Sequence, residues 1–331
     1  MKDGGIHTKI RTLIMASLLA LSAQALAQQQ IVDPDFRPAV AKPAYPNGGP
    51  TVAIDEAHDN FHTMAGQYAP FAALLRADGY KVVASNVPFE RKDLSSLRVL
   101  VVANARNLKA ILAGDIDKPA FTDHECDVLV DWVRAGGSLL LIADHAPFGN
   151  AADSLARRFG VTMGKGWVFD RVSSGGITTQ LDFSRQNGLL GKHSIISGRN
   201  DSERVNTVRA FTGESLTAPS GAIILMKLSP TARNAATPAD MDAENAAVQS
   251  PNPDPSYGSH STSAAGRAQG LAMPFGKGRL VVLGEAALLS AQIIRYTDPE
   301  PRDMKIGMNT SGNDDRQFAL NIVHWLSGLL K

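Results

Sequence analysis

The chain has 331 residues, of which 44% are hydrophobic and 20% charged, so it is long and apolar enough to bury a sizeable core. Its 33 Lys and Arg residues balance 32 Asp and Glu residues, and a formal charge of +1 gives no electrostatic reason to expect nucleic acid or an anionic membrane as a partner. The single cysteine excludes a disulfide framework within the chain and excludes zinc or iron–sulfur sites built from cysteines.

The first 27 residues have the pattern of a secretory signal peptide. A basic start precedes an apolar run at positions 13–21, and Ala25-Leu26-Ala27 offers the small residues that a signal peptidase cuts after. The apolar run is too short for a permanent anchor. We therefore expect cleavage after Ala27, a periplasmic or secreted location, and no transmembrane anchor in the mature chain.

Strand and helix patterns alternate through most of the remaining sequence. Residues 28–50 are rich in proline and predict an extended linker, so folding is expected to begin at Thr51. The alternation predicts a single α/β domain over 51–331, with a mostly parallel sheet, helices on both faces and an elaborated C-terminal half. The expected strands are 51–55, 80–84, 97–103, 138–143, 207–211, 222–227, 270–275 and 279–284. The expected helices are 68–77, 122–135, 151–159 and 314–330.

Three parts of the sequence carry more specific expectations. Thr122 followed by Glu125 predicts a capping box at the start of a helix, and Cys126 in that helix is predicted to be a small core residue. Residues 229–266 contain five prolines and few large aliphatic side chains, which predicts a long, peripheral and mobile loop. Residues 164–206 allow no assignment.

The candidate functional residues follow the predicted strands. Ligands of open α/β sheets bind beyond the carboxyl ends of the strands, where the first strand is followed by DEAHDNFHT, the fourth by DHAPFGN and a late strand by Glu285. Acids and imidazoles in these segments suit proton transfer or metal binding. The candidate catalytic residues are Glu56, Asp144, His145 and Glu285. The candidate ligands of a divalent metal (zinc, iron or manganese) are His58, His62 and His145.

Each of these assignments has a structural alternative. His58 and His62 are four residues apart and would share one face of a helix, but the spacing means less if the segment is a loop with exposed histidines. The alternative for Asp144 and Glu285 is that they are N-caps of the helices that follow them. The Gly-Lys-Gly sequences at 164–166 and 276–278 lack the full phosphate-loop pattern, and no Gly-x-Ser-x-Gly motif supports a serine nucleophile.

Several segments together resemble a known superfamily. GGSLLLIADHAPFG, GKGRLVVLGE and NDDRQFALNIVHWLSGLL, in this order, resemble the class I glutamine-amidotransferase-like superfamily, and more narrowly exported and trehalose-utilisation-protein-like domains of that flavodoxin-like fold. The resemblance covers roughly 51–159 and 270–330. Amidotransferases carry a nucleophilic cysteine after a strand, where this sequence has Ala143-Asp144-His145, and Cys126 lies in the wrong element to replace it. The resemblance therefore implies the fold without glutamine amidotransfer.

The sequence leaves three functions open. The leading hypothesis is an exported hydrolase acting on a small polar metabolite or glycan fragment, either with a metal or through histidine and carboxylate acid–base chemistry. A non-catalytic protein that binds a small ligand is the first alternative, and a scaffold subunit of an envelope complex is the second. The hydrolase hypothesis predicts that His58, His62, Asp144, His145 and Glu285 converge on one cavity.

Overall fold

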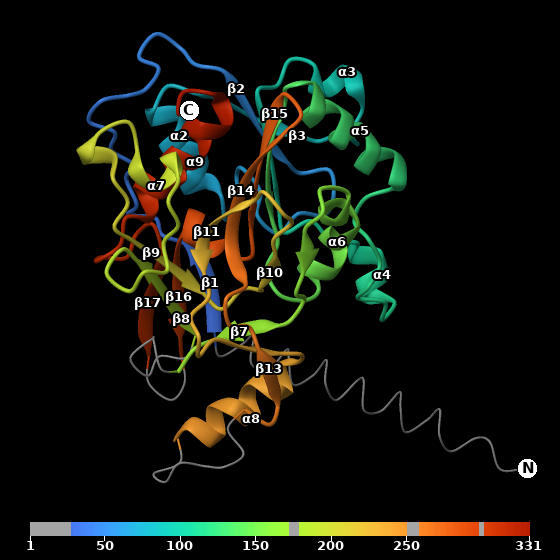
Figure 1. Ribbon diagram of the computed structural model, residues 1–331, viewed down its shortest axis with the longest axis vertical. Coiled ribbons are helices and arrows are strands. Elements are labelled where there is room, and N and C mark those ends of the chain that lie inside the picture. The colour runs from blue at the N-terminus through green and yellow to red at the C-terminus, as the bar shows by residue number, and fades with distance from the viewer. Residues whose placement is uncertain (1–27, 172–178, 250–257, 298–300) are drawn as a thin grey trace, which may run out of the picture.

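The computed structural model describes residues 28–171, 179–249, 258–297 and 301–331 (Figure 1). The predicted signal peptide lies outside the described residues. A nine-stranded sheet forms the centre, in the order β3-β2-β4-β5-β15-β14-β10-β6, with β11 also paired to β14. Its strands are β2 (Thr51–Asp55), β3 (Lys81–Ser85), β4 (Val99–Ala103), β5 (Ser138–Ile142), β6 (Thr162–Met163), β10 (Leu216–Thr217), β11 (Ile223–Lys227), β14 (Ala268–Phe275) and β15 (Gly278–Leu283).

The parallel part of this sheet confirms the predicted fold class. β3, β2, β4, β5 and β15 run parallel to one another, and their order along the sheet is the flavodoxin-like order 2-1-3-4-5 when they are numbered along the chain. β14 then pairs antiparallel to β15, and the pairings of β10, β11 and β6 are also antiparallel.

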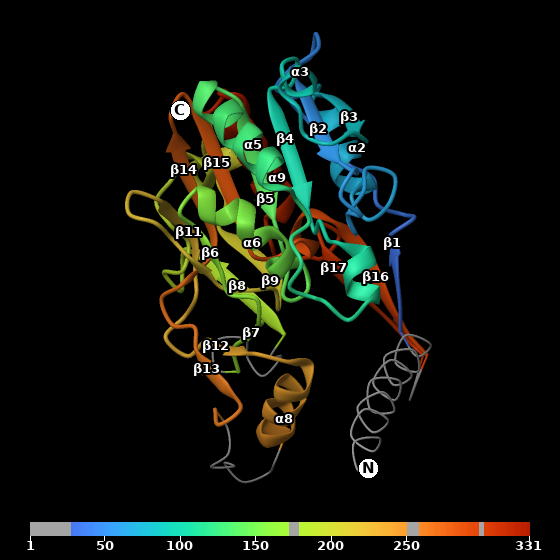
Figure 2. The ribbon, with the colours of Figure 1, turned by 90° about the vertical axis from the view of Figure 1, so that its right-hand side faces the viewer.

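Helices cover both faces of the sheet (Figure 2), because the buried strands send alternate side chains to opposite sides. Val99 and Val101 join a core cluster with α2 (Ala69–Ala77) and α9 (Asp315–Ser327), whereas Leu100 and Val102 join a second cluster with α5 (Asp123–Ala135) and α6 (Phe148–Arg158). Burying each such side chain contributes about 1.5–3 kcal/mol, which explains why these strands contain almost no polar residues.

The start of α5 follows the prediction from the sequence. The Thr122 hydroxyl accepts a hydrogen bond from the Glu125 N–H, and the Glu125 carboxylate accepts one from the Thr122 N–H, which completes a capping box. Cys126 is fully buried in the core beneath α5, as expected. The other helices are α3 (Arg91–Leu94), α4 (Leu108–Leu112), α7 (Ser194–Ser197), α8 (Pro238–Gln249) and the 3-10 turns η1 (Asp201–Glu203) and η2 (Ala287–Leu289).

The predicted linker at 28–50 contains a strand, which corrects the expectation that folding begins at Thr51. β1 (Gln28–Val32) pairs antiparallel with β16 (Ala291–Tyr296), and β16 pairs with β17 (Arg302–Gly307), to form a separate three-stranded sheet. The prediction failed because three glutamines open β1, and because its pairing partner lies more than 250 residues along the chain.

The expectation of a loop without secondary structure at 229–266 is also wrong. β12 (Arg233–Ala235) pairs with β7 (Trp167–Phe169) and with β13 (Ser261–Ser263), and α8 lies beside them at the lower end of the molecule (Figure 1). Polar contacts replace the missing aliphatic side chains here, because buried Glu244 accepts hydrogen bonds from the N–H groups of Gly258 and His260 and from the Ser261 hydroxyl. The mobility of this segment stays a prediction.

The segment 164–206, which the sequence left unassigned, contains a further strand. β8 (Gln180–Ser184) pairs antiparallel with β9 (Thr207–Phe211) in a two-stranded sheet. Within the described parts of the chain, no helix has the length and apolar character needed to cross a membrane.

Candidate functional site

A cavity of about 510 Å³ lies beyond the carboxyl ends of β2, β4, β5 and β15. Parallel strands present all their carboxyl ends at one edge, so residues that follow different strands become neighbours there. The polar side chains that line the cavity from this edge are His62, Asn104, Arg106, Asp144, His145 and Glu285. The three-stranded sheet of β1, β16 and β17 forms another wall of the cavity. Its lining residues are Gln30, Ile294, Tyr296, Met304 and Ile306.

Four of the five residues that were predicted to converge line this cavity. They are His62, Asp144, His145 and Glu285, which come from three different strand ends. His58 and Glu56 are not among its lining residues.

Asp144 follows β5 and is held by hydrogen bonds to both carboxylate oxygens. The Asn104 Nδ2 donates to Oδ2 at 2.7 Å, and the backbone N–H of Ala286 donates to Oδ1 at 3.2 Å. Burial raises the pKa of Asp144 above its usual range, while His145, Asn104 and the Ala286 N–H oppose the shift. These contacts orient the carboxylate and favour its ionised form.

Glu285 follows β15 and is 1% exposed. Its Oε1 accepts a hydrogen bond from the Ala287 N–H at 2.6 Å and its Oε2 accepts one from the Leu288 N–H at 2.9 Å, so it also caps η2. Burial raises the pKa of Glu285 well above its usual range, and the charge of Asp144 raises it further. Because the two carboxyls interact, they titrate as a pair, with Glu285 the better candidate to hold a proton.

A third buried carboxyl, Glu214, lies next to this pair. Its Oε2 accepts a hydrogen bond from the Lys165 N–H at 2.5 Å, and burial raises its pKa well above the usual range, with Asp144 adding to the shift. Gly149 at the start of α6 passes so close that a Cβ there would lie 2.3 Å from Glu214 Oε2. The glycine therefore allows α6 to begin directly over this acid.

Asn104, which sequence reasoning missed, connects the groups from three strands. It follows β4 with a φ of +47° and is fully buried. Its Oδ1 accepts from the Asp144 N–H at 2.9 Å, and its Nδ2 contacts both Asp144 Oδ2 and, at 3.2 Å, His62 Nδ1. The rule that singled out the other strand ends applies equally to this position, because Asn104 comes directly after the apolar strand 97–103.

His62 is 3% exposed and packs against aromatic rings. The centroid of its ring lies 4.7 Å from that of Tyr68 and 5.3 Å from that of Phe61. Burial lowers the pKa of His62 to about 3, so its imidazole is neutral under ordinary conditions. Its Nδ1 contacts Asn104, whereas its buried Nε2 has no hydrogen-bond partner among the described residues.

Aromatic rings and one cation complete the lining. His145 stacks on Trp167, with 4.6 Å between ring centroids, and its Nδ1 lies 3.0 Å from the carbonyl oxygen of Ala146. Phe61 lies 6.0 Å from Phe148, and the Arg106 guanidinium stands 5.8 Å from the Phe61 centroid. The cavity thus combines apolar faces with acids and imidazoles, a mixture typical of sites for small polar ligands.

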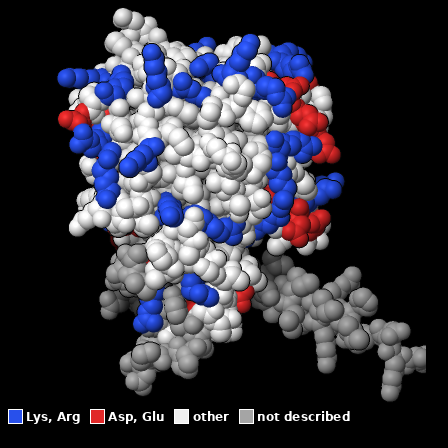
Figure 3. All heavy atoms as spheres, in the orientation of Figure 1, with Lys and Arg blue, Asp and Glu red and all other residues white. Residues whose placement is uncertain are grey.

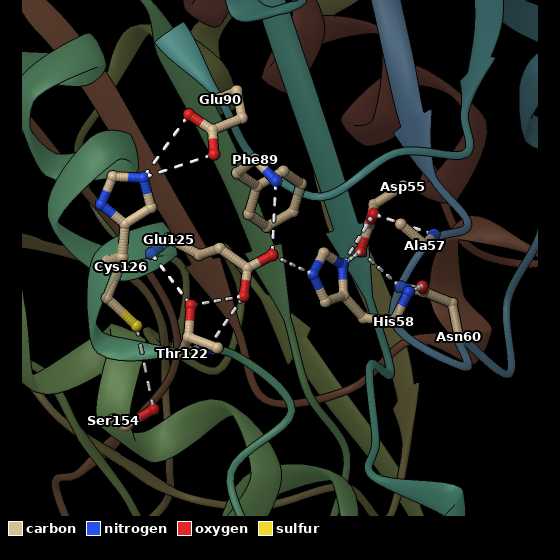
Figure 4. A network of polar contacts seen from close by, with 11 residues as sticks. Asp55, Ala57, His58, Asn60, Phe89, Glu90, Thr122, Glu125, Cys126 and Ser154 are labelled. Atoms are coloured by element: carbon tan, nitrogen blue, oxygen red, sulfur yellow. Dashed lines mark hydrogen bonds and ion pairs between the residues drawn. The ribbon is translucent and has the colours of Figure 1, made fainter.

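His58 belongs to a separate, saturated network (Figure 4). Its Nδ1 lies 2.9 Å from Asp55 Oδ2, and its Nε2 lies 2.9 Å from Glu125 Oε1, the same carboxylate that caps α5. Burial lowers the pKa of His58, but hydrogen bonds and charges from Asp55 and Glu125 outweigh it, so the pKa is raised overall. Since both ring nitrogens are engaged, His58 has no free atom with which to bind a metal.

The predicted metal ligands therefore do not form a common set. In the described ranges, no group of three or more His, Cys, Asp or Glu side chains is placed to hold a metal ion. Residues 56–67 form turns and not a helix, so His58 and His62 do not share a helical face. Glu56 was expected to be catalytic. Its carboxylate accepts a hydrogen bond from the Met64 N–H at 2.7 Å and so stabilises this segment.

Comparison with solved structures agrees with the architecture. The chain resembles the mmIFT52 N-terminal domain, with a TM-score of 0.55 and 13% identity over 84% of this chain and 97% of that domain. It also resembles a ThuA-like protein from Bacteroides uniformis (TM-score 0.42, 11% identity, 89% of this chain and 95% of that one). An exo-β-1,4-mannosidase from an Opitutaceae bacterium has a TM-score of 0.35 at 15% identity, covering 72% of this chain and 31% of the mannosidase.

These likenesses concern the fold alone. The order of the parallel strands agrees with the flavodoxin-like fold that the sequence motifs implied. No family model matches the sequence, and no curated protein is significantly similar to it. The chemistry of the cavity must therefore be argued from its own residues.

Proposed function

We propose that this chain is an exported hydrolase that acts on a small polar metabolite or glycan fragment by acid–base chemistry. The observation that supports this most is the pair of interacting carboxyls, Asp144 and Glu285, at the end of one cavity. Paired acids whose surroundings separate their protonation states supply a general acid and a general base. The cavity volume of about 510 Å³ falls in the range of small-molecule sites.

The contacts support a separate role for each acid. Asp144, fixed by Asn104 and by the Ala286 N–H, is the base that would take a proton from an attacking water. Glu285, with the more strongly raised pKa, would donate a proton to the leaving oxygen. His145, stacked on Trp167 beside Asp144, would stabilise the ionised base through its charge when protonated.

The partners proposed for the chain are uncharged or weakly charged small molecules. Lys and Arg side chains are scattered around the face shown in Figure 3, with Asp and Glu among them at its right edge and at its upper left. This distribution and the balanced net charge support the absence of a nucleic-acid partner. The leader pattern of the first 27 residues supports export.

A second candidate function, binding without catalysis, is favoured by one feature of the same pair. All four oxygens of the Asp144 and Glu285 carboxylates already accept hydrogen bonds from the chain. Such carboxylates serve well as fixed acceptors for ligand hydroxyls, because each oxygen keeps a lone pair that the chain does not use.

The test is a hydrolysis assay on nitrophenyl glycosides and esters with the purified chain lacking residues 1–27. Asp144→Asn and Glu285→Gln should each lower kcat by about 10²–10⁴-fold, the usual contribution of a general acid or base. Asp127→Asn, at an exposed position on α5, is the matched control and should retain activity. A wild-type chain that binds sugars in calorimetry but hydrolyses none of the substrates would instead support the binding function.

A further inference from the structure

Three properties of His62 bear on its role in the cavity. It is 3% exposed, it lines the cavity, and its Nε2 has no hydrogen-bond partner in the described part of the chain. A buried polar group without a partner loses the hydrogen bonds it would make with water, so it needs an explanation. The described side chains around it do not provide one.

The orientation of the Asn104 amide decides which ring nitrogen carries the proton. Because the Asp144 N–H donates to Asn104 Oδ1, the other end of the amide must be the NH₂ group. One of its hydrogens points to Asp144 Oδ2 and the other to His62 Nδ1. Nδ1 is therefore an acceptor, and a neutral imidazole with an acceptor at Nδ1 carries its hydrogen on Nε2.

We propose that His62 is a neutral hydrogen-bond donor, fixed in the Nε2–H tautomer by Asn104, that binds an uncharged oxygen atom of the ligand. This inference rests on the proposed ligand cavity and names the group that the cavity recognises. Asp144 lines the same cavity, and its ionised carboxylate disfavours an anionic group beside it. The ligand oxygen is therefore a hydroxyl or a carbonyl, as in a polyol or a sugar.

The tautomer can be measured without any ligand, by long-range ¹H–¹⁵N NMR correlation on the chain with ¹⁵N-labelled histidine. His62, assigned by the loss of its signals in His62→Leu, should show a protonated Nε2 and a bare Nδ1. Its signals should not titrate between about pH 5 and 8, because it stays neutral over this range. A protonated Nδ1 in the wild type would overturn the proposal.

Two variants at position 104 test whether the asparagine sets the tautomer. Asn104→Asp replaces the donor by an acceptor and should move the proton to Nδ1, while Asn104→Gly removes the side chain and should give a mixture of tautomers. Aspartate and glycine both tolerate the φ of +47° at this position, so neither change strains the backbone. An unchanged Nε2–H tautomer in both variants would contradict the role of Asn104.

The ligand group is tested with glycerol and D-glucose as probes, each titrated to high millimolar concentration. The His62 Nε2–H signal should shift on binding, while the signal of exposed His124, the internal control, should not move. Binding that leaves the Nε2–H signal unmoved, or no binding of either probe, would overturn the assignment of the ligand oxygen. A shift with glucose in a chain that hydrolyses no substrate would refute the proposed hydrolase and leave the role of His62 intact.

Discussion

His58 and His62 lie four residues apart on the same turn, are both buried, and have opposite surroundings. His58 stands between two carboxylates that use both of its ring nitrogens, and its pKa is raised. His62 has one amide contact and packs against the rings of Phe61 and Tyr68, and its pKa is lowered to about 3. The difference shows that burial alone does not set the state of a histidine, whereas the contacts of its two ring nitrogens do.

The largest expected effect comes from removing the carboxylate of Asp55, which accepts a hydrogen bond from His58. Asp55 accepts hydrogen bonds from His58, from the Asn60 side chain and from the Ala57 N–H, and it is fully buried. Asp55→Ala should lower the free energy of unfolding by about 3–5 kcal/mol, because it leaves these buried donors unpaired. Urea denaturation measures the loss.

The control for that variant is Asp127→Ala. Asp127 is exposed and pairs with Arg158 at the surface, so its loss should change stability by less than about 1 kcal/mol. Equal losses in the two aspartate variants would show that the network around His58 contributes nothing particular.

A direct contrast comes from making the same substitution at both histidines. His58→Leu removes the donor that lies between the buried carboxylates of Asp55 and Glu125 and should cost about 3 kcal/mol or more. His62→Leu removes an unpaired buried donor and should stay within about 1 kcal/mol of the wild type. If His62→Leu were the more destabilising of the two, His62 would be a structural residue.

The last expected effect is a pH dependence of opposite sign at the two positions. Because the pKa of His58 is raised above its usual 6.5, the stability it contributes is present below that pH and is lost as the pH rises through its folded value. Because the pKa of His62 is lowered to about 3, its contribution is present above pH 6.5 and is lost as the pH falls toward 3.

The difference in unfolding free energy between wild type and each leucine variant isolates these contributions from those of the other acids. The His62→Leu difference should change only on the acid side of pH 6.5, and the His58→Leu difference only on the alkaline side. The same sign of slope for both variants would contradict the assignment of their surroundings.

Much of the sheet was predictable because its strands are buried on both faces. β4 and β5 are continuous apolar runs, and such runs are typical of parallel strands covered on both sides. β1 was not predictable, since its glutamines pair with β16 through backbone hydrogen bonds that any residue can make. The lobe of β12, β13 and α8 was missed because it relies on the buried carboxylate of Glu244 and not on an apolar face.

The position of the candidate site was predictable from the sequence, but the set of residues that form it was not. The strand-end rule placed Asp144 and Glu285 at one edge, because the topology alone brings those ends together. The rule could not exclude His58. The imidazole of His58 contacts Glu125, which lies 67 residues away in the sequence, and this contact depends on how α5 packs. Asn104 has no charge and no reactive group, so only its contacts show that it joins three strand ends.

The insertion of β15 beside β5 has a consequence for the chain while it is being made. β5 ends at Ile142, but its parallel neighbour begins only at Gly278, and the wall strands β16 and β17 come later still. Pairings between segments so far apart form late, after the local contacts of the N-terminal half. A nascent or truncated chain that stops before Glu285 would carry Asp144 without its acidic partner and without the wall formed by β16 and β17, so the cavity is complete only once nearly the whole chain has been synthesised.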